Sequence, residues 1–583
     1  MFNIVFLSSP DLSQTGDFIY RVRQPGMALA RHSDVRVISA PSICAERDEL
    51  IADADLLILD MVGDNDLIAP VTARRGPTVY EMSDNIFDIQ PWNPCHTYFS
   101  NPHTQASILQ LIAASDLVQT TCQHLCETFS PFHNKLQAFQ NQIRAVHPAA
   151  EKASDRVVVG WGGSLGHLED VAAIADPIAD WLESHPQVEF RVMGHRRIFD
   201  LFERVAEDQK SYTPSGPLSA YESFLDGLHI GIAPIQNTGF NRCRSDVKFL
   251  EYLAHGVVPV CANVGPYAEN VRDGETGLLY SSVDDLIGHL DTLVSDADVR
   301  LAMQRRGHAY VSSERIEAMH SERRLEIYRG LCTPAEAAGE DDLEWAEHYA
   351  HVGLREGRYI EFGMTPAEVE LYEGLTLQGS EAGFSASEVA YRRGIQSQPD
   401  HYLGHLYLGQ SLLSQGNPGP AFEALSRALE LRPASYQAQV LATRALAMAQ
   451  GVSEAVSFAL EVLKSHPSNG RLYCQLGELF DATDSEQGAL SAYEACWAAL
   501  PDYFPGAGEY GVRAFHAGKP AEAVPALASY LKVMPQHATA SFLLGCALLQ
   551  SGKVEAGVQV LQQMRLIHPD DHRPAELLAE LGL

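Results

Sequence analysis

Arg244, Lys248 and Glu251 recur every three or four positions, so they share one face if this segment is helical. Two cations in the loop and first turns of a helix, where backbone N–H groups are unpaired, suit an anion such as a diphosphate. The Glu251 carboxylate, one turn further on, can accept hydrogen bonds from vicinal sugar hydroxyls. The same spacing is typical of a surface helix with salt bridges, so spacing alone leaves both interpretations open.

The segment around these residues predicts a loop, a helix and a strand in that order. Apolar residues between Phe249 and Ala254 have helical spacing and form one stripe. Gly256 stands where the helix ends and a left-handed cap is needed, and residues 257–261 are an apolar run of strand type.

A glycine-rich turn is the second candidate phosphate-binding element. An apolar strand at residues 157–161 leads into Gly162, Gly163 and Ser164, and a helix follows through residue 182. Glycines permit positive φ, and bare backbone N–H groups can face an oxyanion. The turn lacks the G-x-G-x-x-G dinucleotide pattern and alone fits any strand-to-helix connection. Together with the basic helix downstream, it indicates a diphosphate site.

These motifs and their order resemble the nucleotide-sugar glycosyltransferases of the GT-B fold, in the large group of retaining enzymes. The resemblance covers about the first 330 residues and includes the stretches Gly160–Asp170, Asn241–Cys261 and Asp273–Leu279. It implies twin Rossmann-like α/β domains and a nucleotide-diphospho-sugar as donor substrate, with no metal site and no further cofactor. Many relatives have a glutamate eight residues before the position of Glu251, where this chain has Cys243.

The resemblance also assigns site residues. Arg244 and Lys248 would bind the diphosphate and stabilise the charge on the leaving group, and Glu251 would hold the ribose. His167 matches a position near the donor phosphates, although it could instead cap the helix. The full set of expected donor-binding residues is Gly162, Gly163, Ser164, His167, Asn241, Glu251, Pro266 and Tyr267.

The first 152 residues predict a separate α/β domain. Apolar strands at residues 3–7, 35–39, 56–60 and 78–80 alternate with helices, which favours a parallel sheet covered on both faces. Ligands of such sheets lie beyond the carboxyl ends of the strands. The loops that follow these strands are therefore expected to line a cleft.

Two features of this domain are candidates for the acceptor side. His103 precedes the helix at residues 105–114 and could contact the sugar or its leaving group, so it is a catalytic candidate together with Arg244 and Lys248; it could equally cap the helix. The acidic turn at residues 80–85 is similar to the acceptor domains of these transferases. It contains only Glu81 and Asp84 where relatives have more carboxylates, and no catalytic role is assigned to it.

Composition excludes several classes of function. The net charge of −33 over 583 residues repels nucleic acid and anionic membranes. The ten cysteines contain no CxxC pair, so neither a metal site nor a disulfide framework is expected. The N-terminus reads as a strand rather than a signal peptide, and no apolar run approaches the length of a transmembrane segment. We expect a cytoplasmic protein, and self-association as a homo-oligomer is an alternative that the sequence leaves open.

The C-terminal part of the chain has an internal period of 34 residues. Prolines recur at this interval from Pro399 to Pro569, and small residues stand 24 and 12 positions before most of them. Close helix pairs need small residues where their axes approach and a proline where the second helix stops. This is the tetratricopeptide (TPR) pattern. We expect residues 366–583 to form an all-α superhelix with a capping helix.

The predicted domains are therefore residues 1–152, residues 153–331 with the donor site, a linker at 332–365, and the repeats from 366 onward. The linker is expected to be acidic and to contain a helix at residues 343–357.

Three hypotheses on function remain open. The first is a glycosyltransferase whose repeats recruit a protein acceptor, such as a bacterial surface or flagellar protein. The second is a glycosyltransferase acting on a glycan or lipid-linked acceptor, with the repeats as an assembly module. The third is a catalytically silent scaffold, a possibility that the departure at Cys243 keeps open.

Overall fold

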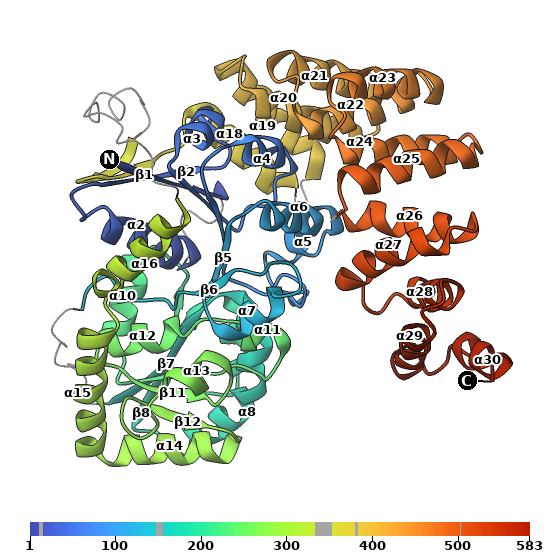
Figure 1. Ribbon diagram of the computed structural model, residues 1–583. Coiled ribbons are helices and arrows are strands. Elements are labelled where there is room, and N and C mark those ends of the chain that lie inside the picture. The colour runs from blue at the N-terminus through green and yellow to red at the C-terminus, as the bar shows by residue number, and fades with distance from the viewer. Residues whose placement is uncertain (11–15, 147–155, 333–351, 379–382, 502, 583) are drawn as a thin grey trace.

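The structure, a computed structural model, describes residues 1–10, 16–146, 156–332, 352–378, 383–501 and 503–582. It contains two sheets, each flanked by helices, and an array of paired helices that lies along one side of them (Figure 1). The prediction of two α/β domains followed by an all-α repeat array is confirmed. None of the helices within these ranges is both long enough and apolar enough to cross a bilayer.

The first sheet has eight strands in the order β13-β14-β2-β1-β3-β4-β5-β6, and all neighbours are parallel except β13 and β14. Its strands are β1 (Phe2–Ser8), β2 (Val35–Pro41), β3 (Leu56–Asp60), β4 (Thr78–Met82), β5 (Leu117–Thr120), β6 (Leu136–Ala138), β13 (Val352–Glu356) and β14 (Tyr359–Phe362). Its helices are α1 (Gly16–Phe18), the π-helix η2 (Ile19–Arg23), α2 (Gln24–Leu29), α3 (Arg47–Asp53), η3 (Asn65–Leu67), α4 (Ile68–Ala73), α5 (His96–Phe99), α6 (Pro102–Ala113) and α7 (Gln123–Phe129).

The second sheet has six parallel strands in the order β12-β11-β10-β7-β8-β9. Its strands are β7 (Val157–Gly163), β8 (Val188–Gly194), β9 (Lys210–Pro214), β10 (Ile230–Ala233), β11 (Val258–Ala262) and β12 (Leu278–Tyr280). Its helices are η4 (Leu165–His167), α8 (Leu168–Ser184), α9 (Arg196–Phe199), η5 (Asp200–Phe202), α10 (Leu218–Asp226), α11 (Gly239–Arg242), α12 (Val247–Ala254), α13 (Gly265–Asn270), α14 (Val283–Ser295) and α15 (Ala297–Glu314). The next helix, α16 (Glu317–Leu331), returns to the first domain, where Leu325 and Tyr328 join its core.

The prediction of a helix at residues 343–357 is wrong for the part that the structure describes. Residues 333–351 lie outside the described ranges, and β13 and β14 form an antiparallel hairpin in place of the end of that helix. Gly357 makes the turn with a positive φ of 62°, and Tyr359, Ile360 and Phe362 are buried in the core of the first sheet. β14 pairs with β2, so this part of the expected linker is an edge of the first domain.

The array consists of helices that pack in antiparallel pairs. They are α18 (Pro366–Gln378), α19 (Gly383–Ser397), α20 (Tyr402–Ser414), α21 (Pro418–Leu431), α22 (Tyr436–Ala449), α23 (Val452–Ser465), α24 (Gly470–Asp481), α25 (Glu486–Ala499), α26 (Phe504–His516), α27 (Pro520–Val533), α28 (Ala538–Gln550), α29 (Val554–Ile567) and α30 (Arg573–Glu580). A Cβ atom on Gly409 would lie 2.4 Å from Leu425, and one on Gly477 would lie 2.6 Å from Tyr493. The periodic small residues are therefore needed where paired helices touch.

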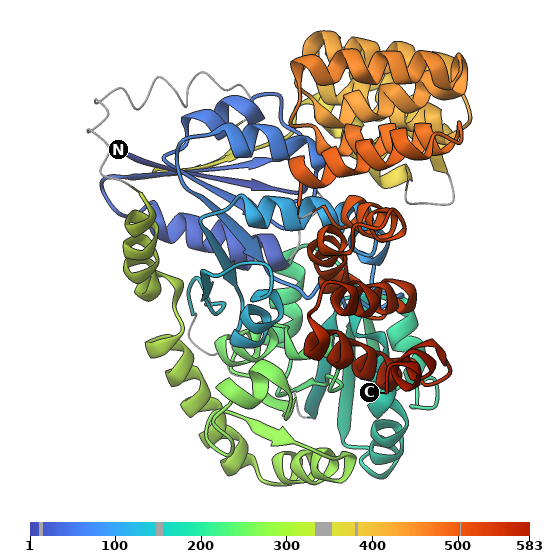
Figure 2. The same ribbon diagram turned by 45° about the vertical axis from the view of Figure 1, so that its right-hand side comes forward.

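The array packs directly against the first domain. Arg471 of α24 donates to Ser107 Oγ of α6 over 2.9 Å, α22 packs on η3, and α26 packs on α6. Figure 2 shows the array beside the blue helices of the first domain. The centre of the junction is Asp66, which is 4% exposed. Its carboxylate receives Arg47 at 2.7 Å and, from the array, Arg432 at 3.0 Å. Two array hydroxyls also donate to it over 2.7 Å, those of Tyr402 and Ser435.

Asp66→Asn should weaken this junction. Burial raises the pKa of Asp66, but Arg47 and Arg432 outweigh it and hold the pKa below its ordinary value. The charge therefore stabilises the fold above the unfolded pKa of about 4, and the contribution is lost as pH falls through the lower folded pKa. We expect Asp66→Asn to lower the free energy of unfolding in urea by about 3 kcal/mol at pH 7, and the difference from wild type to shrink toward pH 3.

The matched control is Asp34→Asn, which removes an exposed carboxylate paired with Arg329 and should cost under about 1 kcal/mol. Equal costs for the two variants would contradict the assignment of Asp66 as the centre of the junction.

Candidate donor-binding site

The glycine turn and the basic helix meet at the carboxyl edge of the second sheet. β7 ends at Gly163, and α11 and α12 follow the neighbouring strand β10. The start of α12 is fixed by Asp246, whose carboxylate pairs with Arg315 at 2.9 Å with both side chains buried. The structure therefore brings together the two elements that the sequence separates by some 80 residues.

Lys248 is the deeper of the two cations. It is 8% exposed, its ammonium donates to the carbonyl of Gly162, and its Nζ lies 5.4 Å from the centre of the Trp161 ring. Burial lowers the pKa of Lys248 to about 8, with Glu251 opposing the shift and Arg244 adding to it. Among the ion pairs of the described residues, Lys248 has no carboxylate partner, so its charge is available to an anion.

The glycines of the turn are needed for close approach rather than for positive φ. Neither Gly162 nor Gly163 has a positive φ, so the prediction that these glycines are needed for a positive φ is wrong. A Cβ atom on Gly163 would lie 2.8 Å from Trp161 and 3.1 Å from Lys248 Nζ. One on Gly166 would lie 3.3 Å from Arg244 Nη2. The bare backbone thus lets both cations reach the turn.

His167 connects Arg244 to a fixed chain of hydrogen bonds. Its Nδ1 donates to Asp170 over 2.9 Å, and its Nε2 accepts from the Arg244 guanidinium. Burial and the charge of Arg244 lower the pKa of His167 to about 3, so the imidazole is neutral and can accept at Nε2. Asp170 is in turn held by the Asn241 amide over 2.8 Å. His167 makes no side-chain cap of the helix, so the capping alternative is not what the structure shows.

Glu251 lies one turn beyond Lys248, where it was predicted. Both of its oxygens accept hydrogen bonds from tyrosines, Oε1 from Tyr20 at 2.9 Å and Oε2 from Tyr221 at 3.0 Å. Burial raises the pKa of Glu251, and Lys248 and the two phenols oppose that rise.

Of the remaining predicted donor residues, one lies in the glycine turn and two lie in α13, which packs on α11. Ser164 is exposed beside Gly166, while Pro266 and Tyr267 are buried in α13. A Cβ atom on Gly265, at the start of α13, would lie 3.0 Å from the backbone of Arg242. Their contacts with a donor remain a prediction.

The first domain contributes to the border of this site. Asp88 Oδ2 accepts from the Phe240 amide over 2.9 Å, and the Asn93 amide lies near Gly166. Burial and Asp84 raise the pKa of Asp17 to about 7, while Arg244 opposes the shift. Glu81 is fully buried and paired with Arg21 at 2.8 Å.

His103 lies at the start of α6 with the repeats in front of it. Its Nδ1 is 3.4 Å from the Tyr503 hydroxyl, and its backbone N–H donates to the Asn101 cap. Burial and the charges of Arg471 and Arg444 lower the pKa of His103. No contact with Arg244 or Lys248 is found among the described residues, and its catalytic role stays a prediction.

Sequence reasoning missed the residues that hold the site in shape. Asp170 follows His167 by three positions, a spacing that could have identified it as the partner of the imidazole. No local signal links Tyr20 or Tyr221 to Glu251, because each meets that carboxylate only through the tertiary fold.

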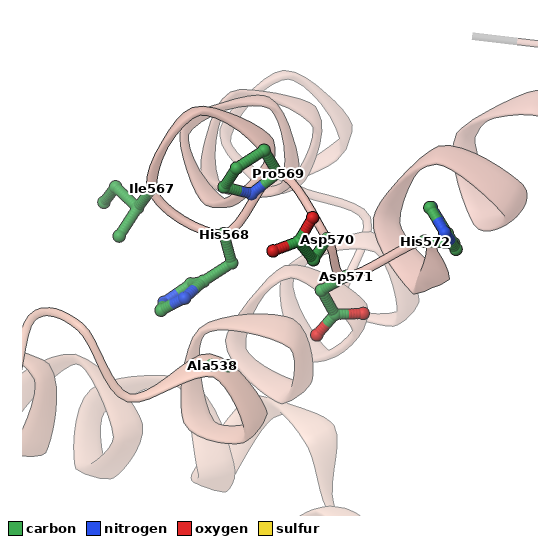
Figure 3. Close-up of a pocket in the computed structure, with 7 residues that line it drawn as sticks. All are labelled: Ala538, Ile567, His568, Pro569, Asp570, Asp571 and His572. Carbon is green, nitrogen blue, oxygen red and sulfur yellow. The ribbon is translucent and has the colours of Figure 1, made fainter.

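A separate hollow lies at the far end of the array. It has a volume of about 520 Å³ and is lined by Ala538 and residues 567–572 between α28, α29 and α30. Figure 3 shows His568 and Asp571 on the side of Ala538, with His572 at the start of α30. Asp571 is already paired with Arg573 at 2.7 Å, and no group suited to a metal ion is found in the described ranges. This hollow is remote from the donor elements.

Comparison with known proteins decides the family of the second domain. Residues 156–296 match the family model for glycosyl transferases group 1, and residues 382–438 and 514–581 match models of the tetratricopeptide repeat. Residues 156–296 are thus a group 1 glycosyltransferase domain. The predicted union of such a domain with TPR repeats is confirmed.

The chain is also similar to individual proteins. Protein FlbA of Caulobacter vibrioides is 29% identical over 151 residues, which are 26% of this chain and 25% of FlbA, so the match spans a quarter of that relative. Sucrose-phosphate synthase of Thermosynechococcus elongatus is 13% identical with a TM-score of 0.44, over 57% of this chain and 99% of that chain. HepE of Anabaena in complex with UDP-glucose is 13% identical with a TM-score of 0.44, over 57% of this chain and 100% of that chain.

Binding of a nucleoside diphosphate should depend on pH through Lys248. Because only the ammonium form attracts phosphate and its pKa is about 8, the affinity should fall as pH rises above 8, by about tenfold per pH unit. Calorimetry with UDP, GDP and ADP checks this. Lys248→Met should bind weakly and without this dependence.

Lys210→Met is the matched control, since Lys210 is another buried lysine of the same domain but pairs with Glu207 at 2.9 Å. Wild-type affinity in Lys248→Met would contradict the site.

Proposed function

We propose that this protein is a glycosyltransferase that moves a sugar from a nucleotide-diphospho-sugar to a protein acceptor held by the TPR array. The observation that carries the proposal is the meeting of Arg244 and Lys248 at the glycine turn of a group 1 domain, with no carboxylate paired to either among the described residues. Two fixed cations in a low-dielectric site stabilise charge that develops on a departing diphosphate.

The roles of the site residues follow from their contacts. Lys248 and Arg244 would bind the diphosphate oxygens, and His167 would orient the guanidinium through its neutral Nε2. Glu251 would accept the ribose hydroxyls. Because two side-chain cations supply the positive charge, we propose transfer without a metal ion, and the resemblance to the retaining group supports retention of the anomeric configuration.

The position of the array supports a protein acceptor. Its helices lie against α6 and η3 of the first domain, and α6 also reaches the loop at the border of the donor site, since the Gln105 amide donates to the Ile86 carbonyl over 3.3 Å. TPR superhelices bind extended polypeptides on their concave face. A polypeptide there would pass the first domain on the side where an acceptor is expected. A bacterial surface or flagellar protein remains one possible acceptor.

Arg244→Ala should lower donor hydrolysis and sugar transfer by about 100-fold or more, because the leaving group loses a charge-assisted contact. The matched control is Arg242→Ala two residues away, whose exposed guanidinium contacts Asn237 at 2.9 Å and should be dispensable. Release of nucleoside diphosphate from a panel of nucleotide sugars measures both. Equal activities of the two variants would contradict the proposed site, and a wild-type protein that binds none of the panel would indicate a silent scaffold.

The acceptor class is tested on the array. Mass spectrometry of proteins produced with and without this enzyme identifies the modified acceptor. Val512→Ser combined with Phe515→Ser changes two half-buried side chains expected on the concave face, and should raise KM for a protein acceptor by about tenfold while leaving donor hydrolysis unchanged. Leu460→Ser combined with Val554→Ser, on exposed positions of second helices, is the control. Normal transfer by the concave-face variant would favour the glycan or lipid-linked acceptor.

A further inference from the structure

The π-helix η2 crosses the border between the two α/β domains. Phe18 and Val22 belong to the core of the first domain, whereas Ile19 and Tyr20 belong to the core of the second. A π-turn widens the helix by one residue and shifts the directions of its side chains, and such turns are frequent at functional sites. Here it lets consecutive residues of one short segment serve two domains.

Arg21 holds this segment firmly in the first domain. It is fully buried, and its guanidinium donates to Glu81 over 2.9 Å, to Asn141 over 2.7 Å and to the Phe139 carbonyl over 2.6 Å. The backbone that presents Tyr20 is therefore fixed by a saturated set of buried hydrogen bonds.

Tyr20 uses this support to reach the second domain. Its hydroxyl donates to Glu251 Oε1 over 2.9 Å, and Tyr221 of α10 holds Oε2 over 3.0 Å. In Figure 1, α2, which continues η2, lies above α10 and α12, with α16 drawn between them. Burial raises the pKa of both phenols, so both keep their protons and act as donors. The carboxylate is thereby fixed from both sides, once by each domain.

We propose that Tyr20 is a positioning residue for the ribose of the donor: it reaches across the domain border to orient the Glu251 carboxylate toward the two ribose hydroxyls. This rests on the proposed function, in which Glu251 accepts those hydroxyls. An ionised carboxylate has about four acceptor positions, and the two phenols occupy two of them. The phenols fix the direction of the two remaining acceptor positions. The ribose-binding site is therefore complete only when the first domain is in place. Tyr20 therefore makes selection of ribonucleotides depend on both domains.

Binding of UDP, GDP and ADP, each compared with its 2′,3′-dideoxy counterpart, tests this by calorimetry on the full chain. We expect Tyr20→Phe to weaken the ribonucleotide that binds wild type by about tenfold, because a hydrogen bond to a charged group is lost. The dideoxy counterpart should bind wild type and Tyr20→Phe equally. With the corresponding nucleotide sugar, KM should rise while kcat changes less than threefold.

Tyr359→Phe is the matched control, since it removes an equivalent phenol-to-carboxylate bond of 2.9 Å, to Glu361, at the far edge of the first sheet. Equal weakening of both nucleotides in Tyr20→Phe would mean that Tyr20 only joins the domains, and would overturn the proposal. Unchanged or tighter ribonucleotide binding would overturn it too, since the phenol would then be idle or a competitor of the ribose. If no nucleotide binds wild type, the proposed function fails instead.

Discussion

The structure of the donor site depends on keeping positive charge unpaired beside bare backbone. Lys248 is buried against Trp161 and a carbonyl, and Arg244 is held by a neutral imidazole. A buried ammonium without a counter-ion is costly, which is why the pKa of Lys248 is depressed. This cost makes the site ready for an anion: a diphosphate would supply the missing charge without first displacing a carboxylate.

Much of the fold could be predicted because its signals are local. Apolar strands next to turns located β1, β3 and β7, and the 34-residue period located the repeats. The chemistry of the site was also readable, since Arg244, Lys248 and Glu251 occupy one helix face and Gly163 ends a strand. The hairpin of β13 and β14 was not predicted from the local sequence. Its strand character comes from pairing with β2, more than 300 residues earlier, and no local pattern reports that partner.

Long-range polar contacts set the limit of such prediction. Asp66 lies in a short helix of the first domain, yet most of its partners come from the array: Tyr402 of α20, Arg432 and Ser435. Tyr20 reads as part of an ordinary helix, and only the fold shows that it enters the core of the other domain. The surroundings of His103 are a similar case. A helix was predicted next to His103, but its contact with the array was not. In each case the residue type suggested a polar role and the tertiary structure chose the partner.

The hairpin has a mechanical consequence for the whole molecule. β14 is hydrogen-bonded into the first sheet, and α18 begins four residues after it. The root of the superhelix is thus a strand of one α/β domain, and Asp66 fastens its side to the same domain. The start of the superhelix is therefore fixed to the first α/β domain at two points. If the two α/β domains moved relative to each other, this part of the array would keep its position relative to the first of them.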